Sequence, residues 1–327
     1  MCKMTNRWMF AAALALAIPF CASTVDAQTY PARRVTVVVP FAGGSASDVI
    51  TRILLDHMSR SLGQTFIVEN RPGAGGNTGT AATAKATPDG YTLVASGSGP
   101  IAANVTLYRD LGYDPEKDFE PISPFAEFPI VIVASKKLPV HTLQEFITYA
   151  KAHPGLNYGS VGIGSSQHLA GAYFEQVAGV KMTHIPYRNI AQYGPDLLAG
   201  TVPLGFQWLP NVAGAIRSGG AGVLAVASKV RLPALPNVPT TAEAGLPSYV
   251  ASGWFAMLAP HGTPRPIVDK INKALAEAIA DPKVRERFSQ QGAQPMALSP
   301  DEARKFNQTE TVKWHDIIKK AGIPVIQ

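Results

Sequence analysis

Short apolar runs alternate with amphipathic, helix-length segments along most of this chain, and this alternation constrains the fold more than any other feature. Each run has four to eight residues, the usual length of a β-strand. The alternation is typical of α/β domains, in which helices cover both faces of mostly parallel sheets. We predict strands at 35–39, 65–70, 92–96, 130–135, 156–161, 183–187, 202–208, 222–228 and 254–259.

The first helix-length segment has an apolar face and is followed by Gly63, a residue that readily takes the left-handed conformation at a helix end. The side chains on that face are Ile50, Ile53, Leu54, Met58 and Leu62. Similar patterns predict helices at 142–155, 165–179, 266–292 and 300–322.

The chain has 327 residues, more than one hydrophobic core usually organises, so two domains are expected. A proline-rich segment at 115–129 interrupts the strand–helix pattern, and a return crossing is expected at 246–260. We therefore predict an α/β fold with two lobes around a hinged cleft. The first lobe would combine 28–127 with 252–327, and the second would be 128–251. Ligands of such sheets bind beyond the carboxyl ends of the strands.

The first 27 residues have the parts of a secretory signal peptide. Lys3 and Arg7 form a basic start, and 8–20 is an apolar run too short to span a bilayer. The small-residue sequence VDA then precedes Gln28. We expect cleavage after Ala27 and export of the rest of the chain.

Both cysteines, Cys2 and Cys21, fall inside that segment, so the exported chain would carry no disulfide and no thiol chemistry. The bulky Phe20 argues against a lipoprotein signal, which prefers a small residue before its cysteine. A soluble exported protein is expected rather than a lipid-anchored one.

The formal net charge of +6 is spread along the chain without a basic run, which disfavours nucleic-acid binding. Cleavage would remove two cations and one anion, Lys3, Arg7 and Asp26, and leave a charge of +5. A mild positive potential would still attract an anionic small molecule. No further run of 18 apolar residues is present to cross a membrane. We also expect the protein to be a monomer.

Three predicted strand-to-helix corners share one chemistry: 40–48 (PFAGGSASD), 96–100 (SGSGP) and 162–168 (GIGSSQH). Their glycines let the backbone approach a ligand, their serines offer donors, and the next helix directs free N–H groups to the same place. Each corner could therefore bind an anion without a charged side chain. The alternative for any single corner is a tight turn with serine as the helix N-cap.

Two other features of these loops favour structural interpretations. Asp48 is placed to cap the N–H groups of its own helix, although it could also receive a ligand ammonium group. The segment 71–79 (RPGAGGNTG) resembles a dinucleotide-binding loop, but Thr78 replaces the third glycine. We expect no cofactor.

Motifs of the common hydrolases and metalloenzymes are missing from the sequence, and so are cysteines for a zinc site. His168 could serve as a base for Ser165 or Ser166, which leaves an exported serine hydrolase as an alternative. No acidic partner is identifiable, and His184 is interpreted as a half-buried core residue. We therefore assign no catalytic residue and no metal site.

Ordered motifs across nearly the whole exported chain resemble one family. They are VVPFAGGSASD, NRPGAGGNTGT, ATPDGYTL, YDPEKDFEPIS, AKAHPGLNYGSVGIGSSQHLAG, HIPYR, LPNVPTTAEAGLP and APHGTP. The family is that of the Bug receptors, the TctC-like periplasmic solute-binding subunits of tripartite tricarboxylate transporters. The resemblance implies a periplasmic location and a type II periplasmic-binding-protein fold whose two α/β lobes close on an organic anion.

The resemblance also implies a set of ligand-binding residues. The family's two ligand loops, which hold a carboxylate through main-chain N–H groups and small hydroxyls, fall on 41–48 and 162–168. Its PY[KR]G segment falls on 186–189, where Asn189 replaces the glycine. Gln207 and Trp208 stand where smaller residues are common, which favours a larger or planar ligand unless Trp208 packs in the core. The candidates are Phe41, Ala42, Gly43, Gly44, Ser45, Ala46, Ser47, Asp48, Ser98, Gly162, Gly164, Ser165, Ser166, His168, Tyr187, Arg188, Gln207 and Trp208.

We thus expect a non-enzymatic receptor for a small organic carboxylate, working with membrane permease subunits or with a sensor kinase. The sequence does not distinguish among four classes of ligand: a dicarboxylate, a tricarboxylate, an aromatic acid and an acidic amino acid.

Overall fold

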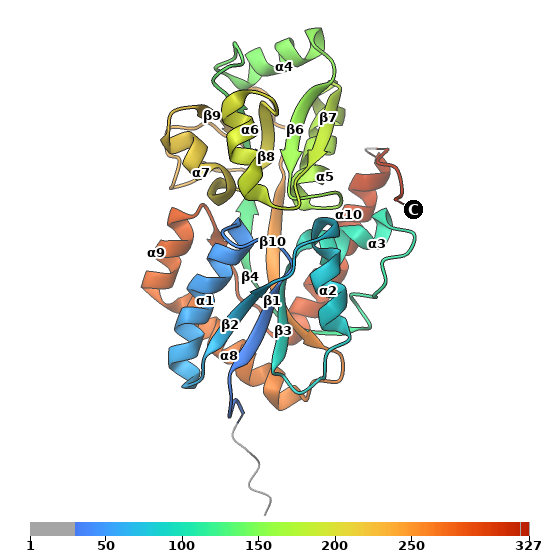
Figure 1. The fold of residues 1–327 in the computed structure, drawn as a ribbon, viewed down its shortest axis with the longest axis vertical. Helices are drawn as coiled ribbons and strands as arrows, with labels where there is room; N and C mark the ends of the chain where they lie inside the picture. Colours follow the sequence, from blue (N-terminus) through green and yellow to red (C-terminus); the bar gives the residue numbers. More distant parts are fainter. Residues whose placement is uncertain (1–29, 321, 327) are drawn as a thin grey trace, which may run out of the picture.

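A computed structural model describes residues 30–320 and 322–326. Two β-sheets, each flanked by helices, form two lobes that lie one above the other in Figure 1. The predicted signal peptide and both cysteines lie outside the described residues. Within the described part of the chain, no helix is both long and apolar enough to cross a membrane.

The first sheet has six strands in the order β11-β4-β10-β3-β1-β2. Its strands come from both ends of the chain, with the 131–226 region placed elsewhere. They are β1 (Val35–Val39), β2 (Phe66–Asn70), β3 (Thr92–Gly97), β4 (Phe119–Pro129), β10 (Ser252–Pro260) and β11 (Gln294–Pro295).

The second sheet has five strands in the order β7-β6-β8-β5-β9. All of them come from the middle of the chain. They are β5 (Val131–Ser135), β6 (Leu156–Ser160), β7 (Met182–Pro186), β8 (Leu204–Gln207) and β9 (Ala221–Val226). The two-lobe α/β class predicted from the sequence is confirmed, whereas the predicted domain limits remain a proposal.

Both sheets are mixed, so the prediction of mostly parallel sheets holds for the direction of most strands but not for all of them. Strand β1 is parallel to β2 and β3, and β6 is parallel to β7 and β8. In contrast, β10 runs antiparallel to β3 and β4, and β5 runs antiparallel to β8 and β9. Strands β10 and β5 adjoin the passages between the lobes, and the short edge strand β11 is also antiparallel to its neighbour, β4.

The proline-rich segment predicted to interrupt the pattern is the long strand β4. It pairs with β10 over its whole length, with two register shifts. One shift lies where Pro124 faces Ala256 and the other where Pro121 faces Leu258. Proline has no N–H to donate to a sheet, so an irregular pairing at these positions accommodates it.

All the predicted helices are present, with one correction, and α2, α3, α6 and α7 are additional helices that were not predicted. Helix α1 ends at Gly63, whose φ of 65° is left-handed, as predicted. The predicted helix at 266–292 is two helices, because Pro282 cannot continue the first one and Asp281 caps the second. The helices are α1 (Ala46–Leu62), α2 (Asn77–Ala84), α3 (Asn104–Leu107), α4 (Leu143–Ala152), α5 (Ser166–Ala178), α6 (Tyr193–Ala199), α7 (Leu209–Arg217), α8 (Arg265–Ala280), α9 (Pro282–Gln290) and α10 (Pro300–Lys320).

The main hydrophobic core continues from one lobe into the other. Trp208 is only 3% exposed and lies between Phe128 and Phe255, with ring centroids 5.5 and 4.8 Å away. Phe128 belongs to β4 and Phe255 to β10, the two strands that adjoin the passages between the lobes. The large aromatic side chain therefore packs in the core that joins the lobes.

Candidate functional site

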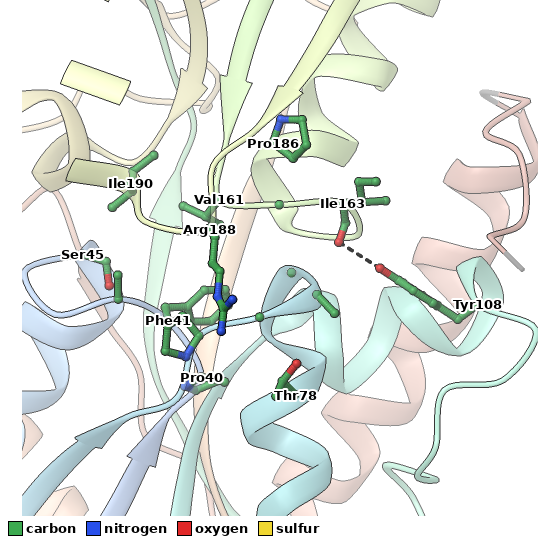
Figure 2. Close-up of a pocket in the computed structure, with 16 residues that line it drawn as sticks. Pro40, Phe41, Ser45, Thr78, Tyr108, Val161, Ile163, Pro186, Arg188 and Ile190 are labelled. Atoms are coloured by element: carbon green, nitrogen blue, oxygen red, sulfur yellow. Dashed lines mark hydrogen bonds between the residues drawn. The ribbon is translucent and has the colours of Figure 1, made fainter. Parts of the chain in front are cut away.

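A cavity of about 590 Å³ lies between the two lobes, beyond the carboxyl ends of β1 and β6. This is the position where α/β sheets bind their ligands. Both lobes contribute to its walls, as Figure 2 shows. The lining residues are Pro40, Phe41, Ala42, Ser45, Pro72, Gly73, Ala74, Gly75, Thr78, Tyr108, Val161, Gly162, Ile163, Pro186, Arg188 and Ile190.

Five of the residues predicted from the sequence line this cavity: Phe41, Ala42, Ser45, Gly162 and Arg188. The structure thus brings together the first corner, the third corner and the segment after β7. The other candidates are not among the lining residues, and their contact with a ligand stays a prediction. They are Gly43, Gly44, Ala46, Ser47, Asp48, Ser98, Gly164, Ser165, Ser166, His168, Tyr187, Gln207 and Trp208.

The corner before α1 is held by its own hydrogen bonds. Ser45 is the N-cap, and its hydroxyl accepts from the backbone N–H of Asp48 at 3.4 Å. The Asp48 carboxylate accepts from the Gly44 N–H at 2.9 Å and from the side chains of Arg52 and Asn70. Burial opposes ionisation of this carboxyl, but these hydrogen bonds, led by that of Arg52, hold the pKa of Asp48 below its ordinary value. Asp48 therefore has a structural role, as predicted, but it holds the loop before α1 through the Gly44 N–H, while the N-cap of the helix is Ser45.

The corner before α5 is built in the same way. Ser165 is the N-cap, and its hydroxyl donates to the carbonyl oxygen of Gly162 at 2.7 Å. The Gly164 N–H donates to Nδ1 of His168 at 3.2 Å, which places the ring proton on Nε2. Burial lowers the pKa of His168 to about 4, so the ring is neutral at pH 7. The described hydrogen bonds of Ser165 and His168 do not join the hydroxyl to the ring, so a nucleophile–base pair is not formed.

The remaining predicted residues connect parts of the fold. The Ser98 and Ser166 hydroxyls are 2.7 Å apart and buried, and they join the two lobes. Gln207 donates from Nε2 to the Gly159 carbonyl oxygen at 2.8 Å. Tyr187 donates to Asp196, and burial together with this carboxylate raises the pKa of its hydroxyl.

Arg188 differs from these residues because its side chain is exposed and points into the cavity. Across residues 30–320 and 322–326, its guanidinium makes no ion pair and no hydrogen bond. It is also the single charged side chain in the lining. A guanidinium offers donors in a planar fork that matches a carboxylate, so the cavity has a cation ready for an anion.

Comparison with known proteins agrees with this geometry. The family profile described as "Tripartite tricarboxylate transporter family receptor" matches residues 50–323. The chain belongs to this receptor family. BugT of Bordetella pertussis (strain Tohama I) is 39% identical over 303 residues, which are 92% of this chain and 93% of BugT.

Two solved structures of similar receptors have the same fold. The periplasmic binding protein BugD is 36% identical, with a TM-score of 0.85 over 90% of this chain and 99% of BugD. The structure "R. palustris Rpa4515 with adipate" is 35% identical, with a TM-score of 0.87 over 90% of this chain and 99% of that one. The family is one of transporter receptors and BugD is a periplasmic binding protein, not an enzyme, so the hydrolase alternative is wrong.

Sequence reasoning missed one wall of this receptor's cavity, the loop Pro72–Gly75 with Thr78. The loop follows β2, and its glycines are the same signal that marked the other corners. Ala74 has a φ of 45°, the one left-handed non-glycine residue in the described chain. The similarity of 71–79 to a dinucleotide-binding loop drew attention away from this simpler signal, a run of glycines directly after a strand.

Tyr108, at the end of α3, is a second missed residue of the receptor's cavity. Its hydroxyl donates to the Ile163 carbonyl oxygen at 3.1 Å, as the dashed line in Figure 2 shows. This hydrogen bond crosses from one lobe to the other at the edge of the cavity. No motif in the sequence relates these two residues, because 55 positions separate them.

Proposed function

We propose that this receptor captures a small organic carboxylate in the cavity between its lobes and delivers it to the membrane permease of a tripartite tricarboxylate transporter. The observation that carries this proposal is the unpaired guanidinium of Arg188 inside the cavity. Adipate, with which the similar protein Rpa4515 was solved, is an anion of this class.

Capture would use donors from both lobes. Arg188 lies on the second lobe, while Thr78 and Tyr108 bring hydroxyl groups from the first. Hydrogen bonds to a charged group contribute roughly 1.5 to 3 kcal/mol each. A few of them suffice for about micromolar affinity, near −8 kcal/mol, after the costs of ordering the ligand and the lobes.

We further propose that the mature receptor begins at Gln28, carries no lipid and works as a periplasmic monomer. The intact mass of the exported protein tests the cleavage site, and its elution volume tests the monomer. A diacylglycerol adduct on Cys21 would contradict the first part, and a stable dimer would contradict the second.

Calorimetry with a panel of carboxylates tests the binding function. We expect about one site per chain, recovery of the ligand with unchanged mass, and binding at least tenfold weaker in Arg188→Gln. Arg285→Gln is the matched control, since Arg285 is an exposed arginine on α9 away from the cavity. Chemical conversion of a ligand, or equal affinity in Arg188→Gln and the control, would refute the proposal.

A further inference from the structure

We infer that the ligand has one carboxylate at Arg188, an uncharged hydrocarbon body and no ammonium group. This inference rests on the proposed function, because it names the class of carboxylate that the same cavity accepts. It distinguishes among the ligands that the sequence leaves open: acidic amino acids and tricarboxylates are disfavoured, whereas aromatic and straight-chain acids are favoured.

The charges around the cavity give the first argument. Arg188 lines it, and none of the other lining residues is charged. The nearest acidic residue in the corner sequences, Asp48, is buried, and its carboxylate already accepts three hydrogen bonds within its own lobe. An ammonium group in this cavity would lose water without gaining an anionic partner, which is unfavourable.

The walls of the cavity give the second argument. Pro40 and Phe41 line it from the first lobe, and Val161 and Ile190 line it from the second. In Figure 2 Val161 and Ile190 lie near the start of the Arg188 side chain, and Pro40 and Phe41 lie near its guanidinium end. Apolar walls contributed by both lobes favour a hydrocarbon body in the cavity. A tricarboxylate would place further charges against these walls with only one cation available.

The remaining polar side chains on this cavity wall are neutral. The Thr78 hydroxyl is exposed and has no hydrogen-bond partner within the described residues, and the Tyr108 hydroxyl has its lone pairs free to accept. These hydroxyl groups can form hydrogen bonds with an oxygen at the far end of a ligand, for example the second carboxylate of a long dicarboxylate. They cannot balance the positive charge of an ammonium group.

Matched ligand pairs test the inference. Adipate is compared with 2-aminoadipate, and phenylacetate with phenylalanine, by calorimetry on the full exported protein. In whichever pair binds, we expect the acid without an ammonium group to bind at least tenfold more tightly than its amino-acid counterpart. Citrate should bind more weakly than that acid. Arg188→Gln should weaken this binding at least tenfold, and Arg285→Gln should leave it unchanged.

A gain-of-function variant tests the charge argument directly. Thr78→Asp adds a carboxylate to the wall at an exposed position and should shift the ratio within the pair towards the amino acid by about tenfold. Thr78→Asn is the neutral control and should not shift it. If the wild-type protein binds an amino acid as tightly as its partner, or prefers citrate, the inferred class is wrong while the receptor function stands. If no carboxylate of the panel binds, the proposed function itself fails.

Discussion

The backbone N–H of Ala46, in the first turn of α1, donates to the side-chain oxygen of Asn211 at 2.9 Å. Asn211 lies at the start of α7 in the other lobe, and its amide donates to Gln207 at 3.0 Å. Gln207 in turn donates to the Gly159 carbonyl oxygen. A chain of three hydrogen bonds thus connects the helix of one lobe to the sheet of the other. It satisfies an N–H at the helix start that would otherwise need water or an anion.

Asn211→Ala should favour separation of the lobes, because it removes the acceptor of Ala46 and the donor to Gln207. We expect ligand affinity to fall by about three- to tenfold, since a net hydrogen bond is worth about 0.5 to 1.5 kcal/mol. X-ray scattering should show a larger radius of gyration at equal ligand saturation. Asn237→Ala, at an exposed asparagine, is the control. Identical affinity and scattering in both variants would refute this role.

Gly75→Ala should hinder contact between the lobes. A Cβ on Gly75 would overlap the carbonyl oxygen of Ile163 in the other lobe, far inside van der Waals contact. Gly112→Ala is a close control, because Gly112 is also left-handed, with φ of 74°, but has open space around the added Cβ. Both variants carry a similar backbone strain. We expect at least a tenfold loss of ligand affinity in Gly75→Ala alone, and an equal loss in the two variants would contradict the prediction.

The stability of the protein should fall in mild acid because of His168. Burial lowers its pKa to about 4 in the folded protein, whereas an unfolded histidine titrates near about 6.5. Between these values the unfolded chain binds more protons, so the free energy of unfolding decreases as the pH falls through this window. The contribution is at most about 1.4 kcal/mol per pH unit.

Urea unfolding at several pH values measures this slope. His168→Gln should flatten it, and His141→Gln, at an exposed histidine, should not. His184 reinforces the effect in the wild type, because burial and the neighbouring His168 ring, 4.2 Å away, lower its pKa to about 3. An unchanged slope in His168→Gln would show that the ring titrates normally.

Ser165→Ala should destabilise the fold more than it weakens binding. The hydroxyl caps α5 and donates to Gly162, so its loss should lower the free energy of unfolding by about 0.5 to 2 kcal/mol. Ligand affinity should fall less than in Arg188→Gln, because this hydroxyl is already engaged by protein groups. Urea unfolding and calorimetry on the same variant compare the two effects. A tenfold loss of affinity with unchanged stability would instead assign Ser165 to the ligand.

Much of the local structure could be predicted from the sequence, because it depends on residues close together in the chain. Every predicted strand overlaps an observed one, and α1 has the predicted apolar face and ends at Gly63. The glycine-rich corner at 40–48 could also be predicted to lie at the cavity. Its buried strand, its turn and its helix cap follow one another directly in the sequence, so the signal is local.

The tertiary structure decided the features that depend on residues far apart in the chain. Proline-rich β4 is a strand only because β10, more than a hundred residues later, offers a partner that accommodates its prolines. Tyr108 becomes a cavity residue only where Ile163 meets it from the other lobe. The sequence shows that Arg188 is a cation. Only the packing of the two lobes determines that it has no partner within the described residues and lies among apolar cavity walls. Local periodicity and capping set the elements, while burial and charge at the site arise from contacts that no short stretch of sequence contains.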